Sequence, residues 1–127
     1  MKCKYFLRSL MDALQGIVSA ITREKNMKLH LAGAVIALAA SFYFKVGRIE
    51  FLFVCTAIAL VFVAEMLNTA VEAAVDLKTE EFHPLARLAK NVAAGAVLCA
   101  AIFALVVGFI VFAGRLKDLL GYYLRGG

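Results

Sequence analysis

An uninterrupted apolar stretch over residues 92–114 constrains the fold of this chain more than any other feature. No charged side chain occurs within it. A helix needs about 20 such residues to cross the hydrocarbon core of a bilayer, where backbone polar groups have no water to bind. Two further apolar stretches precede it, a long one over 51–75 and a shorter one over 29–44 that needs its neighbours to span. We therefore expect three transmembrane helices, over about residues 29–47, 51–76 and 90–114.

The composition also indicates a small membrane protein. Of the 127 residues, 64% are hydrophobic and 18% are charged, whereas soluble domains have about 45–50% and about 25%. These values disfavour a soluble enzyme and exclude a disordered chain, and the length allows one domain. The net charge of +5 fits loop topology and anionic headgroups. Without a basic stripe on a soluble fold, we expect no nucleic-acid partner.

The N-terminal segment has the pattern of an amphipathic helix rather than of a signal peptide. Apolar side chains recur at helical spacing from Leu7 to Ile21, and polar or charged side chains recur on the opposite face from Lys4 to Arg23. These polar residues interrupt the apolar run that a signal peptide requires. Because the polar face carries lysine and arginine, we expect a helix over about residues 4–26 that lies in the membrane interface.

The basic residues predict the orientation of the spans. Three spans place the two termini on opposite sides of the membrane. Nine Lys and Arg residues then share the side of the N-terminal segment and of the second loop, residues 77–89 with the adjoining Lys90. Five share the side of the first loop and of the tail, residues 115–127. The positive-inside rule predicts a multi-pass protein with its N-terminus and second loop in the cytoplasm.

Carboxylates inside the second apolar stretch need an explanation. Glu65, Asn68, Glu72 and Asp76 are spaced at i, i+3, i+7 and i+11, which places them within an arc of about 80° on one helix face. Such polar side chains can join transmembrane helices, and this role suits Asn68. It suits the two glutamates poorly, since a carboxylate in the membrane needs a cation or a proton. We therefore predict a functional role for Glu65 and Glu72.

Other polar residues near the membrane edge extend this cluster. Glu24 precedes the first apolar stretch and could meet Glu72 to hold Mg²⁺. Taken alone, Glu24 fits a solvated surface position beside Arg23 and Lys25 better. Lys90 stands where the third span begins, where it could bind phosphate or anchor the helix end. The chain has no glycine-rich phosphate loop. A phosphate and metal site or a proton pathway would both fit.

Two segments carry a resemblance to a known family. Residues 65–76 (EMLNTAVEAAVD) and 83–98 (HPLARLAKNVAAGAVL) resemble the signature of the small prokaryotic diacylglycerol kinases. Gly16 and residues 24–30 (EKNMKLH) are similar to the undecaprenol kinase branch of that family. The resemblance extends over about residues 9–112.

The resemblance implies a homotrimer of three-span subunits, with active sites between subunits, in a bacterial plasma membrane. It implies transfer of the ATP γ-phosphate to a lipid hydroxyl with Mg²⁺, for lipid recycling. In this reading Glu65 is the catalytic base and contacts the lipid, Glu24 and Glu72 are metal ligands, and Ala94 lines the lipid site. Asn68 and Asp76 support the site. The implied ATP contacts are Asp12, Glu24, Glu72, Glu81, Phe82, His83, Lys90 and Asn91.

One departure from the family pattern leaves alternatives open. Asn91 stands where the family usually has aspartate, and an amide keeps an acceptor oxygen but loses a charge. The first hypothesis is therefore a lipid kinase for undecaprenol or diacylglycerol, with undecaprenol modestly favoured. The alternative is a catalytically impaired membrane-binding or scaffold paralogue. A proton-coupled transporter is disfavoured because three spans are few.

Overall fold

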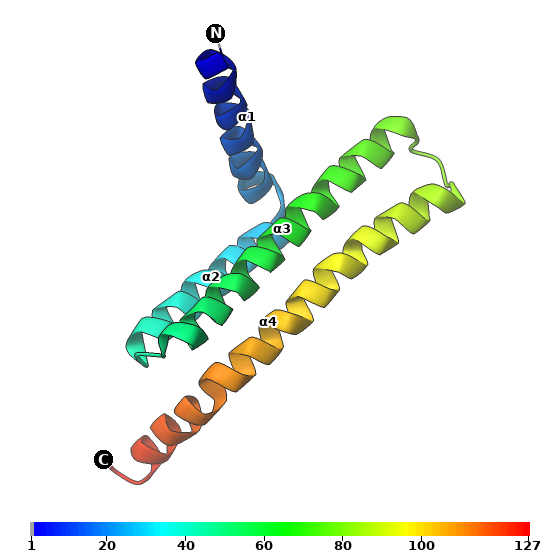
Figure 1. Ribbon diagram of the computed structural model, residues 1–127. Coiled ribbons are helices and arrows are strands. Elements are labelled where there is room, and N and C mark those ends of the chain that lie inside the picture. Colours follow the sequence, from blue (N-terminus) through cyan, green and yellow to red (C-terminus); the bar gives the residue numbers. More distant parts are fainter. Residues whose placement is uncertain (1) are drawn as a thin grey trace.

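The structure is a computed structural model that describes residues 2–127. Every regular element in this range is a helix, in the order α1 (Lys2–Arg23), α2 (Lys25–Tyr43), α3 (Arg48–Lys78) and α4 (Pro84–Leu124). The helices α2, α3 and α4 run alongside one another, with α3 in contact with both of the others, and α1 leaves this bundle at an angle (Figure 1). The all-helical fold expected from the sequence is confirmed.

Two ion pairs fix the register of the antiparallel α3 and α4. Asp76 Oδ1 lies 2.6 Å from Lys90 Nζ at one end of the hairpin, and Glu50 Oε2 lies 2.8 Å from an Arg115 guanidinium nitrogen at the other. The stretch of α3 between the two pairs is nearly as long as the stretch of α4 between them, so the register is uniform. At 1.5 Å per residue the pairs are separated by about 39 Å. A hydrocarbon core of about 30 Å fits between them.

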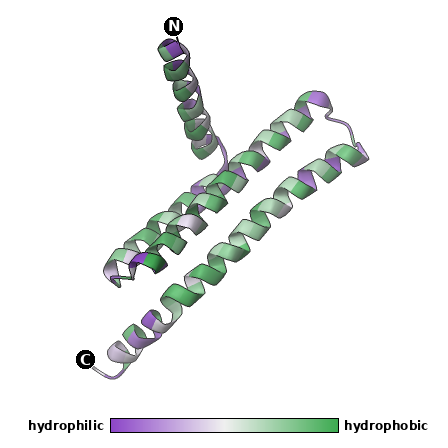
Figure 2. Ribbon diagram, in the orientation of Figure 1, coloured by the Kyte–Doolittle hydropathy of each residue, from purple (hydrophilic) through white to green (hydrophobic). Residues whose placement is uncertain are grey.

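The helices α3 and α4 are the two that are long and apolar enough to span a membrane. In their most apolar parts only 22% of α3 and 11% of α4 is buried within the chain, unlike the core helix of a soluble protein. Figure 2 shows hydrophobic residues along the middle of both helices and hydrophilic residues towards the turn between them. Large side chains such as Leu105, Phe109 and Ile110 are each 73% exposed. Such exposure is typical of helices that face lipid or another protein surface.

The helix α2 packs along α3 and has a weaker membrane signal. It has 19 residues, and its buried positions Met27, Ala34 and Ser41 recur at heptad spacing on one face. Its length and place match the first expected span. Unlike α3 and α4, however, α2 is not apolar enough to be identified as a membrane span. The role of α2 as a third span therefore stays a prediction.

The helix ends differ from the boundaries expected from hydropathy. The helix α4 begins at Pro84, so only residues 79–83 separate it from α3, where a longer loop over 77–89 was expected. The cause is local: Pro84 occupies the first helical turn, and the backbone N–H of Leu85 donates a hydrogen bond to His83 Nδ1. The expected tail is also helical as far as Leu124. Hydropathy predicts only the apolar part of a helix, whereas α4 extends beyond its apolar part into polar sequence at both ends.

The helix α2 ends earlier than the expected span, at Tyr43. Lys45 has a left-handed φ of 51°, and the backbone N–H of Val46 donates to the carbonyl of Ser41, a pattern typical of a helix C-terminus. The helix α3 then begins after Gly47, whose backbone N–H donates to the Glu50 carboxylate at 3.0 Å. The connection between α2 and α3 is therefore short, over residues 44–47.

The N-terminal helix α1 is continuous over 22 residues, as the sequence pattern predicts. Its apolar residues Leu7, Leu10, Leu14 and Val18 are exposed, and only Ala20, near its end, is buried. The apolar face of α1 therefore has no partner within the described chain. Its place in the membrane interface stays a prediction.

Candidate active site

The buried face of α3 changes from apolar to polar halfway along the helix. Its buried residues are Val54, Ala57, Val61, Glu65 and Asn68, at spacings of three and four that form a single seam. Towards the first half of α3, Val54 and Ala57 belong to the hydrophobic core together with residues of α4. Beyond Val61 the same seam presents a carboxylate and then an amide. The predicted site residues on α3 therefore begin where the apolar core ends.

Glu65 is among the most deeply buried side chains in the described part of the chain, at 2% exposure. Its Oε2 atom lies 3.7 Å from Nε2 of His30 on α2. This distance is longer than a hydrogen bond but within the range of an ion pair. Glu65 is a predicted site residue, whereas the sequence predicted no role for His30. The signal that was available is a histidine that interrupts an otherwise apolar stretch.

Asn68 and Glu72 are joined one turn further along α3. The Asn68 Nδ2 atom donates a hydrogen bond to Glu72 Oε1 at 3.3 Å. The Asn68 Oδ1 atom is buried and has no hydrogen-bond partner within the described chain, which is costly for an acceptor unless a further group reaches it. Asn68 also lines a space of about 470 Å³ between α3 and α4. Asn68 therefore orients Glu72 and retains a free acceptor.

The packing of α2 on α3 brings Glu24 to the level of Glu72. The two helices are antiparallel (Figure 1), and the contact between His30 and Glu65 sets their register. At 1.5 Å per residue, Glu24 lies about 9 Å before His30 along α2, and Glu72 lies about 10 Å beyond Glu65 along α3. Because the helices are antiparallel, both displacements point towards the same end of the bundle. Glu24 is the half-buried cap residue before α2. The two carboxylates predicted to share a metal thus lie at similar depth.

Five of the eight residues predicted to contact ATP lie at the turn between α3 and α4. A cleft of about 410 Å³ lies there, within the size range of small-molecule sites. Arg87 lies 5.9 Å from the centroid of the exposed Phe82 ring, and His83 caps α4. The predicted residues that line the cleft are Asp76, Glu81, Phe82, His83, Lys90 and Asn91.

Lys90 has a partner that the sequence did not reveal. Its Nζ atom lies 2.6 Å from Asp76 Oδ1, with the two side chains 40% and 56% exposed. The ion pair holds the ammonium group at the cleft rather than in open solvent. Asn91 follows at the edge of the same cleft and is exposed.

Asp12 and Ala94 line neither this cleft nor the buried face of α3. Asp12 is exposed on α1, about 16 Å along the helix axis from the last residue of α1, Arg23. The register of the α3–α4 hairpin places Ala94 close to the level of Glu72, with its side chain exposed. Within one chain, therefore, Asp12 does not join the cleft, and Ala94 lies beside the site on the outer surface.

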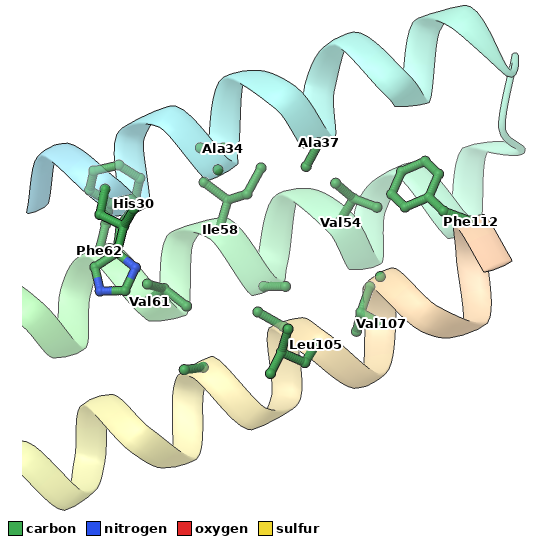
Figure 3. Close-up of a pocket in the computed structure, with 16 residues that line it drawn as sticks. His30, Ala34, Ala37, Val54, Ile58, Val61, Phe62, Leu105, Val107 and Phe112 are labelled. Atoms are coloured by element: carbon green, nitrogen blue, oxygen red, sulfur yellow. The ribbon is translucent and has the colours of Figure 1, made fainter. Parts of the chain in front are cut away.

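An apolar groove runs along the bundle as far as His30, the residue that faces Glu65. It has a volume of about 380 Å³ and lies between α2, α3 and α4. Small side chains such as Ala34, Ala37 and Ala57 line it. Figure 3 shows His30 at one end and Phe112 at the other. The groove is thus apolar along its length and ends at the histidine that faces Glu65.

No group of three or more His, Cys, Asp or Glu side chains in residues 2–127 is arranged to hold a metal ion. A magnesium site does not require such a group. Mg²⁺ usually keeps several waters and binds one or two carboxylates together with substrate phosphates. The pair Glu24 and Glu72 therefore fits the way in which Mg²⁺ binds beside a nucleotide.

Comparison with known proteins assigns the family. Residues 11–112 match the sequence profile of the prokaryotic diacylglycerol kinases. An undecaprenol kinase of Bacillus subtilis (strain 168) is 37% identical over 111 residues, or 87% of this chain and 90% of that protein. A diacylglycerol kinase of Synechocystis is 37% identical over 115 residues, or 90% of this chain and 66% of that protein. A diacylglycerol kinase of Haemophilus influenzae is 31% identical over 109 residues, or 85% of this chain and 92% of that protein. The resemblance found in the sequence is thereby confirmed, and the chain belongs to the prokaryotic diacylglycerol kinase family, a family of lipid kinases.

Proposed function

We propose that this protein transfers the γ-phosphate of ATP to the hydroxyl group of a membrane lipid alcohol, with Mg²⁺, and serves lipid recycling in a bacterial plasma membrane. Glu65 carries the proposal, because it is a carboxylate at 2% exposure within an apolar helix. Asp76 lies three turns further along the same face of α3, at the exposed cleft where it pairs with Lys90. Glu72 lies between Glu65 and Asp76 on that face. A lipid hydroxyl arrives at Glu65 from the bilayer, and ATP arrives at the cleft from water.

The chemistry of phosphoryl transfer suits this arrangement. Such reactions depend mainly on positioning and on neutralisation of phosphate charge. Glu65 accepts the proton of the lipid hydroxyl while the hydroxyl oxygen bonds to the γ-phosphorus. The bond from the γ-phosphorus to the bridging oxygen breaks, and ADP leaves. General base catalysis of this kind contributes about 10²–10⁴-fold, and Lys90 offsets the negative charge of the phosphates.

Glu24 and Glu72 are the residues that would hold Mg²⁺. Their similar depth at the junction of α1, α2 and α3 supports this role, as does the hydrogen bond from Asn68 that orients Glu72. When bound, the ion offsets phosphate charge and orients the triphosphate. Removing either carboxylate would leave one protein ligand for the ion.

The remaining nucleotide contacts in this proposal come from Glu81, Phe82, His83 and Asn91 at the cleft, and from Asp12. Because Asp12 lies apart from the cleft of its own chain, the proposal includes a homotrimer in which α1 of a neighbouring copy completes the site. The exposed apolar faces of α1 and α4 support such an assembly, since they have no partner within the described chain.

The lipid alcohol in this proposal is undecaprenol or diacylglycerol. The similarity to the Bacillus subtilis undecaprenol kinase favours undecaprenol, and the similarity to the Synechocystis diacylglycerol kinase keeps the second lipid in the test. Ala94, exposed beside Glu72, would line the path of the lipid. Asn91 favours a second candidate function, an impaired membrane-binding or scaffold paralogue, because the charge of the family aspartate is missing.

The test is a radiolabelled ATP assay on purified protein with Mg²⁺, offered each lipid separately in detergent micelles. Label that enters one lipid supports the kinase, whereas label in neither lipid supports the scaffold. In the same assay we expect Glu65→Gln to fold and bind ATP but to lose turnover by about 10²–10⁴-fold. The matched control is Glu50→Gln on the same helix, which removes a carboxylate far from the site and should retain turnover. A Glu65→Gln variant with turnover near wild type would remove Glu65 from the role of base.

A further inference from the structure

The carboxylate of Glu65 has one partner in the described chain that can bear a positive charge. His30 Nε2 lies 3.7 Å from Glu65 Oε2, and the two side chains are 23% and 3% exposed. No other side chain in residues 2–127 forms an ion pair or hydrogen bond with that carboxylate in the structure. A glutamate has several rotatable bonds, so apolar packing alone leaves the direction of its oxygens weakly defined.

The place of His30 links this carboxylate to the apolar groove. His30 lies at one end of the groove of about 380 Å³, and Figure 3 shows its imidazole ring near Phe62 and Val61 of α3. The ring is therefore held between the groove on one side and Glu65 on the other. A shift of about 0.5 to 1 Å in either side chain closes the contact to a hydrogen bond.

From this geometry we infer that His30 is a positioning residue for Glu65. The imidazole Nε2–H donates to Glu65 Oε2 and leaves Oε1 directed at the lipid hydroxyl. A hydrogen bond from this N–H also satisfies one oxygen of the buried carboxylate, which apolar surroundings alone disfavour. The inference rests on the proposed role of Glu65 as the base. It adds that α2, through a residue far earlier in the chain, determines the direction in which that base acts.

The chemical step is unchanged by this inference. The hydroxyl proton moves to Glu65 Oε1, the hydroxyl oxygen bonds to the γ-phosphorus, and the phosphorus bond to ADP breaks. His30 gains and loses no atom in this step. Its effect is on the geometry of the base, where a displacement of about 1 Å can cost about 10²-fold in rate.

The test compares His30→Ala, His30→Gln and Leu29→Ala in the same assay of ATP and lipid. We expect His30→Ala to lower kcat by about 10–100-fold with the KM for lipid changed less than about threefold. His30→Gln keeps a donor of similar reach and should remain within about fivefold of wild type. Leu29 lines the same end of the groove but is 71% exposed, so Leu29→Ala is the matched control and should leave kcat unchanged.

Two further measurements separate positioning from a merely structural role. Added imidazole should restore part of the kcat of His30→Ala, because the removed ring leaves a space that opens on the groove. A role in folding alone would not respond to imidazole. In a Glu65→Gln background, His30→Ala should cause no further loss, since the group that it positions is already absent. Thermal unfolding of each purified variant checks that the fold is intact, and His30→Gln serves as the test if His30→Ala does not fold.

The outcomes distinguish this inference from the proposed function. If Glu65→Gln is inactive but His30→Ala has a kcat within about threefold of wild type, the role of His30 is refuted and that of Glu65 stands. An equal loss in Leu29→Ala, or a fully additive loss in the double variant, also refutes it. If Glu65→Gln retains turnover, the base assignment fails, and the role of His30 fails with it.

Discussion

Lys90 has two possible roles, and replacing it with glutamine separates them by magnitude. As a structural group it forms an ion pair with Asp76 at 2.6 Å, and both side chains are substantially exposed. Exposed ion pairs contribute at most about 1 kcal/mol, which corresponds to about fivefold in an equilibrium constant. A hydrogen bond to a charged phosphate is worth about 1.5–3 kcal/mol, or about 10–150-fold.

We therefore expect Lys90→Gln to lower kcat/KM for ATP by about 10–100-fold, while the free energy of unfolding falls by less than about 1 kcal/mol. The assay is an ATP titration at saturating lipid with Mg²⁺, together with thermal or denaturant unfolding in detergent. Because the ammonium group faces the cleft and not the groove, the KM for lipid should stay unchanged. The two readouts then assign the loss to the nucleotide rather than to the fold.

The opposite end of the hairpin offers a matched control. Arg115 pairs with Glu50 at 2.8 Å, with similar exposure and between the same two helices. Arg115→Gln should therefore lower stability by a similar amount and leave the ATP titration unchanged. Asp76→Asn breaks the pair at Lys90 but keeps the ammonium group, so its effect on ATP should be smaller than that of Lys90→Gln. A loss below about fivefold in Lys90→Gln, or an equal loss in Asp76→Asn, would show that the ion pair alone accounts for Lys90.

Three further predictions test the metal, nucleotide and lipid positions. Glu24→Gln and Glu72→Gln should each raise the Mg²⁺ concentration needed for activity and be non-additive in combination; additive losses with an unchanged Mg²⁺ requirement contradict a shared ion. Asn91→Asp should lower the apparent KM for ATP or raise kcat with lipid preference unchanged, because a carboxylate there gains Lys90 as a neighbour; a shifted lipid titration with an unchanged ATP titration contradicts this placement. Ala94→Leu should raise the KM for lipid and leave that for ATP unchanged; the reverse pattern would move residue 94 to the nucleotide.

The carboxylate stripe was predictable because one helix determines it. The spacing of Glu65, Asn68, Glu72 and Asp76 fixes their shared face from the sequence alone. In the structure Glu65 and Asn68 are buried on that face, and Asn68 donates to Glu72. Apolar stretches likewise predicted α2, α3 and α4, and amphipathic periodicity predicted α1. Local periodicity carries both predictions, so neither needs knowledge of how the helices pack.

Contacts between helices were not predictable in the same way. His30 and Glu65 are far apart in the chain, and their contact depends on the register between α2 and α3. A short connection over residues 44–47 and a left-handed Lys45 set that register. The pair of Asp76 and Lys90 depends similarly on the short turn that Pro84 and His83 define before α4. Hydropathy placed that turn too broadly, because α4 begins before its uninterrupted apolar stretch and includes the basic residues Arg87 and Lys90.

The seam on α3 explains why stability and chemistry can share one helix. From Val54 to Val61 the seam is apolar, and Val54 and Ala57 pack in the core with α4. Glu65 and Asn68 continue the seam at the same spacing. Burying those two polar side chains costs stability unless each forms hydrogen bonds or ion pairs. Neither is fully paired within the described chain: the nearest ionisable partner of Glu65 is a histidine at 3.7 Å, and Asn68 Oδ1 has no hydrogen-bond partner. Groups left unsatisfied in a folded protein are candidates for substrate binding. The apolar half of the seam therefore holds the helices together, and in the proposed function the polar half is left to meet a hydroxyl and a phosphate.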